Sequence, residues 1–285
     1  MNQKLSVEKL RTVLAAVNAG CDIEARLAQD PVGIVRRYSR RDEQEMVGLL
    51  ASSLAFGNVK TLRASIERAL EAIGGDIVEA ARDPAYLRSR LEGFRHRMVQ
   101  GQELAQLMWG ASQVSRVYGS LGESFAERLK KRSNFRDALI EWTSELRAYG
   151  KIGDGASANR RGPAQILPDP SKDSSCKRLL LYLRWMVRRD DGVDMGVWPQ
   201  VSPSVLMIPV DTHIHRIGLN LGMTERQSPS YRVSEEITAV LRRIDSRDPV
   251  RFDFALCHLG MAGACRSERG ESCEGCGLRG VCRYW

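Results

Sequence analysis

The spacing of apolar residues predicts a pair of helices within residues 42–73. Apolar side chains recur there every three or four residues, the period of a helix with one buried face. These apolar positions are Met46, Leu49, Leu50 and Leu54, followed by Leu62, Ile66 and Leu70. The sequence Phe56-Gly57-Asn58 interrupts the period and favours a turn. We therefore expect a helix, a turn and a second helix.

The helical period returns further along the chain, and no stretch shows the sustained two-residue alternation of a strand. Helices are expected at residues 103–117, 135–148 and 234–244. The sequence thus predicts an all-α fold. Between residues 150 and 172 glycine, proline and charged residues accumulate, which indicates a long loop or flexible connection.

A further helix is expected directly after that loop, with Asp173 or Ser174 as its N-cap. One face of this helix is apolar and consists of Cys176, Leu179, Leu180, Leu183, Met186 and Val187. Lys177 would then lie in the first turn, where the positive end of the helix dipole disfavours an ammonium ion and lowers the pKa of the side chain. A lysine that is partly neutral can attack carbon and form an imine. The alternative is a surface lysine beside Arg178.

Another helix is expected to begin at Asp211, within the sequence Val210-Asp211-Thr212-His213-Ile214-His215-Arg216. Asp211 is well placed to be its N-cap, and capping alone would explain an aspartate there. A carboxylate held in this way can also stabilise positive charge on a sugar or move a proton. His213 and His215 point to different helix faces, so each is better explained as a packing residue than as a metal ligand.

The charge of the chain is compatible with a nucleic-acid partner. The 285 residues have a hydrophobic fraction of 43% and a net charge of +8. The excess comes from three basic clusters: Arg36, Arg37, Arg40 and Arg41; Arg88, Arg90, Arg95 and Arg97; and Arg128, Lys130, Lys131 and Arg132. Such clusters either bind phosphates or are solvated helix faces. No apolar run is long enough to span a bilayer and no signal-peptide pattern is present, so we expect a soluble cytoplasmic protein.

Four cysteines near the C-terminus form the strongest chemical motif. Cys265, Cys273, Cys276 and Cys282 are spaced C-x7-C-x2-C-x5-C. A disulfide pair conflicts with an intracellular location, where thiols stay reduced. Zinc sites with four cysteines usually contain two C-x2-C pairs, whereas this motif has one. Iron–sulfur clusters accept more varied spacing, so the motif favours a cluster, with zinc as the alternative.

Taken in order, these motifs resemble the helix-hairpin-helix DNA glycosylases of the endonuclease III type. The resemblance rests on Val210-Asp211-Thr212-His213-Ile214, on Cys257-His258-Leu259-Gly260 and on the four cysteines, with Leu49–Phe56 similar to an early helix of the family; it extends from residue 42 to 282. It implies that Asp211 is the catalytic aspartate. It also implies a 4Fe-4S cluster held by Cys265, Cys273, Cys276 and Cys282, although the first gap is one residue longer than usual.

The hairpin of that family reads L-P-G-V-G-x-K and presents the nucleophilic lysine. The corresponding segment here is Leu167–Lys177, in which both glycines are missing. Lys177 is the equivalent of the nucleophile, and Lys172 is its rival. The interval from Lys177 to Asp211 is longer than in endonuclease III, so either the helix is extended or an added loop projects over the pocket. Trp185 and Trp198, which lie in it, would either contact an extruded base or pack in the core.

The resemblance implies two helical domains, residues 43–205 and residues 1–42 with 206–285, the second closed by the cluster loop. It implies a base-excision repair glycosylase, with or without abasic-site lyase activity, that acts on double-stranded DNA as a monomer and associates with the nucleoid. Leu54 would be an apolar wedge beside the flipped base, and Arg266 and Arg279 would contact the DNA. Two alternatives stay open: a non-catalytic iron–sulfur protein that binds nucleic acid, and an enzyme acting on a modified nucleotide or on RNA.

Overall fold

The computed structural model describes residues 6–154, 160–262, 265 and 268–285. Within these residues the chain is mostly helical, which confirms the all-α prediction. Strands in the described part are limited to β1 (Arg95–His96) and β2 (Val99–Gln100), which pair antiparallel with Arg95 opposite Gln100. No helix in that part combines the length and apolar character needed to cross a membrane.

Most helices follow one another with short connections, and the longest connection described is that from α12 to α13. Before the strands lie α1 (Val7–Ala19), α2 (Ile23–Leu27), α3 (Val32–Val35), α4 (Arg41–Ser53), α5 (Val59–Ile73), α6 (Ile77–Ala80) and α7 (Pro84–Arg90). After them come α8 (Gly101–Tyr118), α9 (Leu121–Lys131), α10 (Phe135–Gly150), α11 (Gly162–Ile166), α12 (Lys177–Val187), α13 (Thr212–Asn220), α14 (Tyr231–Ile244) and α15 (Asp253–Met261). Short 3-10 helices occupy Pro203–Val205, Glu271–Cys273 and Arg279–Val281.

The predicted helix pair around residues 56–58 is confirmed as α4 and α5. The side chain of Asn58 accepts the N–H of Lys60 at 3.0 Å and thereby caps α5. Gly57 adopts a φ of +98° in the turn, a conformation that favours glycine. The predictions at 103–117, 135–148 and 234–244 are confirmed by α8, α10 and α14.

The predicted loop over residues 150–172 is wrong in one respect, because α11 lies within it. Pro163 near the start of α11 is compatible with a helix, since the first turn needs no N–H donor there. Residues 155–159 of this segment lie outside the described part.

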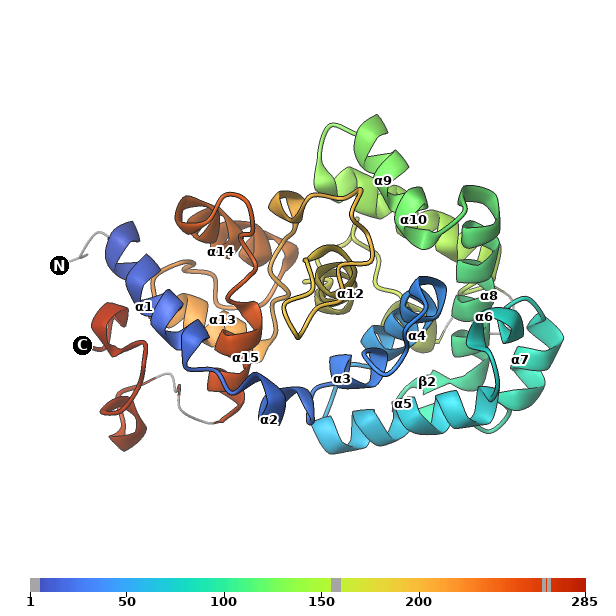
Figure 1. Ribbon diagram of the computed structural model, residues 1–285, viewed down its shortest axis with the longest axis horizontal. Coiled ribbons are helices and arrows are strands. Elements are labelled where there is room, and N and C mark those ends of the chain that lie inside the picture. The colour runs from blue at the N-terminus through green and yellow to red at the C-terminus, as the bar shows by residue number, and fades with distance from the viewer. Residues whose placement is uncertain (1–5, 155–159, 263–264, 266–267) are drawn as a thin grey trace.

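The helices gather into two groups with α12 between them (Figure 1). The α4–α10 segment forms one group, and α1, α13, α14 and α15 lie together on the other side, so both ends of the chain belong to the same group. Helix α12 packs against α4, and one continuous hydrophobic core extends from Leu10 to Leu278. The domain boundaries derived from the resemblance stay a prediction.

The connection from α12 to α13 packs against the core instead of projecting over a pocket. The N–H of Trp198 donates to the carbonyl of Met186 at 2.9 Å, and its indole Nε1 donates to Oε1 of the buried Glu45 at 2.7 Å. Trp185 and Trp198 are both fully buried. Packing in the core is therefore confirmed for both tryptophans, and contact with an extruded base is wrong because neither ring reaches the surface. Helix α12 ends at Val187, so it is not extended either.

Candidate active site and cysteine cluster

A cleft of about 650 Å³ contains most of the residues singled out in the sequence. Its walls come from the residues before α3, the turn between α4 and α5, the first turns of α12, the residues leading into α13, and α15. Both helix groups therefore contribute to it. The volume lies within the range of small-molecule and nucleotide pockets.

Lys177 lines this cleft as the first residue of α12. Its predicted place in a first helical turn is confirmed, and the predicted apolar face of the helix is buried. The N-cap prediction is wrong: the cap is Cys176, in a left-handed conformation with φ of 49° and no side-chain capping bond. The hydroxyl of Ser174 instead accepts the N–H of Cys176 at 3.3 Å and so stabilises the turn before the helix.

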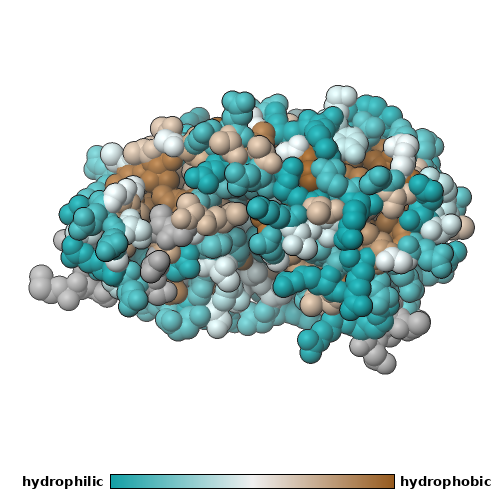
Figure 2. All heavy atoms as spheres, turned by 90° about the horizontal axis from the view of Figure 1, so that it is seen from below, coloured by the Kyte–Doolittle hydropathy of each residue, from teal (hydrophilic) through white to brown (hydrophobic). Residues whose placement is uncertain are grey.

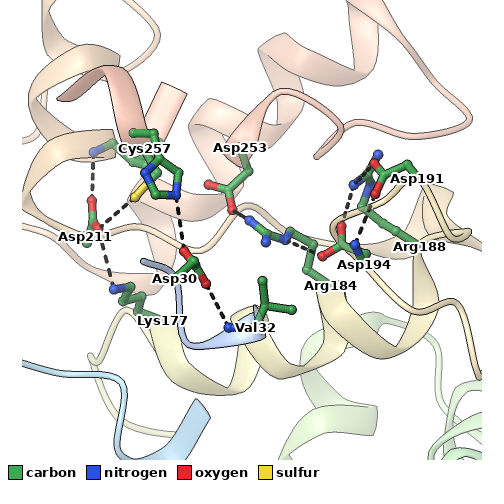
Figure 3. A network of polar contacts seen from close by, with 12 residues as sticks. Asp30, Val32, Lys177, Arg184, Arg188, Asp191, Asp194, Asp211, Asp253 and Cys257 are labelled. Carbon is green, nitrogen blue, oxygen red and sulfur yellow. Dashed lines mark hydrogen bonds and ion pairs between the residues drawn. The ribbon is translucent and has the colours of Figure 1, made fainter. Parts of the chain in front are cut away.

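Asp211 is the N-cap of α13, as predicted. Its Oδ1 accepts the N–H groups of His213 and Ile214, both at 2.9 Å. These bonds leave Oδ2 free to face the cleft, where Lys177 Nζ lies at 3.5 Å and the thiol of Cys257 donates at 3.5 Å (Figure 3). The structure thus brings together the lysine and the aspartate that the sequence singled out. The structure does not join His213 and His215 in a metal site, since His215 Nε2 contacts the carbonyl of Arg226 at 2.7 Å.

The predicted lowering of the Lys177 pKa is wrong. Burial and the start of a helix do disfavour the ammonium ion, but the charges of Asp211, Cys257, Asp30 and Asp253 outweigh this and raise the pKa of Lys177 above its ordinary value. Burial acts against the Asp211 carboxylate, yet Lys177 and the backbone N–H of Ile214 hold the pKa of Asp211 below its ordinary value. At neutral pH the two groups are therefore an ammonium and a carboxylate.

A second acidic group reaches the cleft from the N-terminal side and was missed in the sequence. Asp30 Oδ2 lies 3.3 Å from Nε2 of the buried His258, and its Oδ1 accepts the N–H of Val32 at 2.9 Å. Burial raises the pKa of Asp30, but the bonds from His258 and Val32 outweigh it and lower the pKa. His258 belongs to the quoted Cys257-His258-Leu259-Gly260 sequence, but nothing local to Asp30 signals a pairing across more than two hundred residues.

A chain of buried ion pairs continues from the cleft into the protein (Figure 3). Arg184 of α12 pairs with Asp253 of α15 and, at 3.1 Å, with Asp194. Arg188 pairs with Asp194 as well and reaches Asp248 at 3.0 Å. Burial raises the pKa of Asp253 to about 6 in spite of Arg184. Arg184 and Asp253 both line the cleft, so a buried ion pair forms part of its otherwise mixed polar and apolar wall.

Two other residues assigned to the site lie elsewhere. Lys172 is exposed and is not among the residues that line the cleft, so the structure separates it from Asp211. Leu54 is fully buried at the end of α4, and the prediction that it is a wedge beside a flipped base is wrong, because it fills the core. The residues of that turn that do line the cleft are Phe56, Gly57 and Asn58.

The four C-terminal cysteines meet at one small pocket. Cys265, Cys273, Cys276 and Cys282 all line it, and none of them is joined in a disulfide to another described residue. Asn220 donates to the sulfur of Cys265 at 3.2 Å, and the N–H of Gly270 donates to that of Cys273 at 3.5 Å. Burial, and the proximity of the other cysteines, raise the pKa of Cys276 and Cys282. In the described residues, no group of three or more histidine, cysteine or acidic side chains is arranged to hold a metal ion.

The arginines near these cysteines are stacked on the terminal tryptophan. The guanidinium carbons of Arg269 and Arg279 lie 3.6 and 3.8 Å from the ring centroid of Trp285. Arg279 is exposed, which is compatible with the predicted contact to DNA. Arg266, predicted for the same role, lies outside the described residues.

The three basic clusters differ in their partners. In the first, Arg36, Arg37, Arg40 and Arg41 all pair with carboxylates. In the third, Arg128, Lys131 and Arg132 pair with glutamates. Over the described residues, no carboxylate lies within ion-pair distance of Arg88, Arg90, Arg95 or Arg97. Only the second cluster therefore keeps its positive charge fully available to an external anion.

These observations define an all-α protein with a lysine–aspartate pair in a cleft lined by further buried charges. A family model described as "Protein of unknown function (DUF2400)" matches residues 30–262, and the chain belongs to that family. The matched region includes Asp30, Lys177, Asp211 and His258 and ends before Cys265. No curated protein and no solved structure matches the chain.

Proposed function

We propose that this protein is a DNA glycosylase of the helix-hairpin-helix, endonuclease III type, with abasic-site lyase activity. The observation that carries the proposal is the distance of 3.5 Å between Lys177 Nζ and Asp211 Oδ2 at the wall of the cleft. These residues come from two segments of the chain and are the two that the resemblance assigns to catalysis. A cleft of about 650 Å³ accommodates a nucleoside turned out of a duplex.

The charge state of the pair suits a reaction in which the lysine gives up its proton during catalysis. The ammonium of Lys177 protonates the departing base, which takes the electron pair of the C1′–N bond with it. The lone pair freed on Nζ then forms a bond to C1′, while the Asp211 carboxylate stabilises the positive charge that develops on the sugar. The C1′–O4′ bond then breaks, O4′ takes the electron pair and one proton from Nζ, and a protonated imine remains between Nζ and C1′. Loss of a C2′ proton to Asp211 then expels the 3′ phosphate and nicks the strand.

The proposed cofactor is an iron–sulfur cluster held by the four C-terminal cysteines, and two observations support it. All line one pocket, and two of their sulfurs accept N–H donors, from Asn220 and Gly270, as cluster thiolates do. A single zinc ion with Zn–S bonds of about 2.3 Å would draw four thiolates into a tight tetrahedron. A 4Fe-4S cluster spaces its ligands more widely and would join the segment 265–282 into one rigid loop. Cys265, Cys273, Cys276 and Cys282 would be its ligands.

The cofactor proposal is tested by iron, sulfide and zinc analysis of the purified protein. We expect about four irons and four sulfides per chain. Cys276→Ser should lose them, whereas Cys21→Ser, a change of a cysteine outside the pocket, should keep them. One zinc per chain without iron would favour the zinc alternative. No metal in protein purified without oxygen would refute both.

The proposed partner is double-stranded DNA, bound by a monomer in the nucleoid, with Arg279 among the residues that contact the phosphates. The activity is tested by borohydride trapping on duplexes that carry oxidised pyrimidines, oxidised guanine, uracil or an abasic site. We expect a covalent adduct with the wild-type protein and with Lys172→Ala, and none with Lys177→Ala. Lys172→Ala is the matched control, because this lysine is exposed and outside the cleft.

The other outcomes identify the alternatives. An adduct that is lost only in Lys172→Ala would refute the assignment of Lys177. Retained DNA binding without an adduct on any duplex would refute the lyase step and favour a non-catalytic iron–sulfur binding protein, for which the missing hairpin glycines argue. An adduct formed only with single-stranded or structured RNA would favour an RNA enzyme.

A further inference from the structure

Two arginines lie against the turn between α4 and α5, at the edge of the cleft. The guanidinium carbon of Arg178 is 4.7 Å from the centroid of the Phe56 ring. On the next residue, a Cβ built on Gly57 would lie 3.3 Å from Nη1 of Arg97, so that guanidinium rests on the glycine. Phe56, Gly57 and Arg178 line the cleft itself. The two guanidinium groups therefore flank the turn through which a strand would approach Lys177.

A third arginine belongs to the same group. Arg68 of α5 donates to Ser65 at 3.2 Å, and Ser65 in turn contacts Nδ1 of the buried His96 at 3.0 Å. Nε2 of His96 contacts the carbonyl of Phe56 at 3.2 Å. Burial lowers the pKa of His96, and the charges of Arg97, Arg68 and Arg178 lower it further. Three guanidinium groups thus surround a neutral imidazole.

None of these three arginines has an acidic partner in the described part of the chain. The ion pairs of the molecule involve Arg36, Arg37, Arg40, Arg41, Arg128, Arg132, Arg184 and Arg188, among others. Arg178 in addition has a buried Nη1 without a hydrogen-bond acceptor, and burial lowers the pKa of its guanidinium to about 10. A partly buried cation such as Arg178 is normally paired, so this arrangement is suited to an anion that arrives from outside.

The exposed location agrees with an external ligand. Arg68 and Arg97 are exposed, and Arg97 lies at the tip of the β1–β2 hairpin. The side of the molecule below α5 and α2 in Figure 1 is covered mostly by hydrophilic residues (Figure 2). Planar guanidinium groups on both sides of one turn match successive phosphates of a strand, because each can donate two parallel hydrogen bonds to one phosphate.

We propose that Arg68, Arg97 and Arg178 form a phosphate-binding site for the nucleic-acid strand that places its nucleotide in the cleft. The inference rests on the proposed function, since it takes the strand next to Lys177 as the ligand. Arg178 binds the phosphate nearest the cleft. Arg97 and Arg68 bind the neighbouring phosphate of the strand, beside the β1–β2 hairpin. These arginines are positioning residues, and none takes part in the chemistry.

The first test measures binding to a duplex with a tetrahydrofuran residue, an abasic analogue that cannot form an imine. The variants are Arg97→Ala and Arg178→Met, which keeps an apolar stem over Phe56. The matched control is Arg132→Ala, whose guanidinium is exposed but paired with Glu141. We expect about a tenfold weaker Kd for each test variant and a salt dependence lower by about one phosphate contact per arginine. The control should keep the Kd and salt dependence of the wild-type protein.

The second test identifies the phosphate. Replacing a phosphate beside the analogue with an uncharged methylphosphonate should weaken binding of the wild-type protein but have little further effect on Arg178→Met. If both variants keep the Kd and salt dependence of the wild type, or if the methylphosphonate weakens every protein equally, the inference is wrong.

Base excision by the wild-type protein is scored separately, so that the two proposals fail independently. Excision without a contribution from these arginines overturns the phosphate site alone. Arginine-dependent binding without excision or trapping overturns the glycosylase and supports the phosphate site. If the wild-type protein binds no duplex, both the glycosylase proposal and the phosphate site are wrong.

Discussion

Replacing Asp211 in two ways separates its role as a helix cap from its proposed role in chemistry. The Asp211→Asn side chain would still accept the N–H groups of His213 and Ile214, because asparagine caps a helix as well as aspartate does. Asp211→Ala removes these bonds. We therefore expect Asp211→Ala to be about 1 kcal/mol less stable than Asp211→Asn, measured as the free energy of unfolding in urea.

The two variants should fail alike in chemistry. Both remove the carboxylate that lies 3.5 Å from Lys177 Nζ. At that separation the attraction is worth roughly 1 kcal/mol in a water-like medium and about 5 kcal/mol at an effective dielectric constant of 20. Lys177 and Asp211 are 31% and 15% exposed, so the true value lies between these limits. Its loss leaves burial as the main influence on Lys177, and the pKa of Lys177 should fall.

The assay is the rate of borohydride trapping on a duplex with a preformed abasic site, measured against pH. No base has to leave this substrate, so the rate reports the fraction of neutral amine. In Asp211→Asn the rise of the rate with pH should move to lower pH, while excision from an intact damaged nucleotide should be lost. Lys172→Ala should keep the wild-type profile. An unchanged profile together with wild-type excision in Asp211→Asn would mean that Asp211 is a cap and nothing more.

Three further changes test the packing and the buried charges. Leu54→Ala should cost about 2 to 5 kcal/mol of stability, because Leu54 is fully buried. The DNA affinity of this variant, measured at a temperature where the variant is folded, should equal that of the wild type. A loss of affinity would favour the prediction that Leu54 is a wedge beside the flipped base. Trp198→Phe removes the indole donor to the buried Glu45, which keeps the N–H groups of Leu121 and Gly122 as donors, and should cost about 1 to 3 kcal/mol in urea denaturation; an unchanged midpoint would show that the indole bond adds nothing to stability. The pKa of Asp253 rises to about 6 on folding, so the folded state binds this proton more tightly than the unfolded chain, and the contribution of Asp253 to stability should decrease by about 2 kcal/mol as the pH rises from 4 to 6. Denaturation of Asp253→Asn at both pH values should lack this decrease; a pH dependence equal to that of the wild type would contradict the assignment.

Local patterns were sufficient to predict most of the helices. The apolar period of residues 42–73 and the capping side chain of Asp211 act within a few residues, so both could be predicted from the sequence. The cap of α12 could not, because Cys176 adopts a positive φ that residue preferences disfavour. The depth of Leu54 was missed for a related reason: helical periodicity gives a face, but the packing of α4 against α12 decides that this face is the core.

The electrostatics of the site depend on long-range contacts and were predicted poorly. The expected pKa of Lys177 considered only its helix, whereas Asp211, Asp30 and Asp253 reverse the direction. The pairing of Asp30 with His258 joins opposite ends of the chain and leaves no local signal. Charge clusters read from sequence were likewise misleading, because Arg36, Arg37 and Arg40 pair with carboxylates far along the chain, Asp190, Glu67 and Asp76.

The ion pairs that run from Asp253 through Arg184, Asp194 and Arg188 to Asp248 tie α12 to α15, and Arg184 and Asp253 line the cleft between these helices and the α4–α5 turn. Opening the cleft like a hinge would separate charges that water cannot reach, at a cost of several kcal/mol. The ion pairs therefore hold α12 and α15 at a fixed separation on their side of the cleft before any ligand arrives. In the proposed complex with a duplex, α12 and α15 would keep their arrangement, and the nucleic acid would change its shape to bring a nucleotide into the cleft.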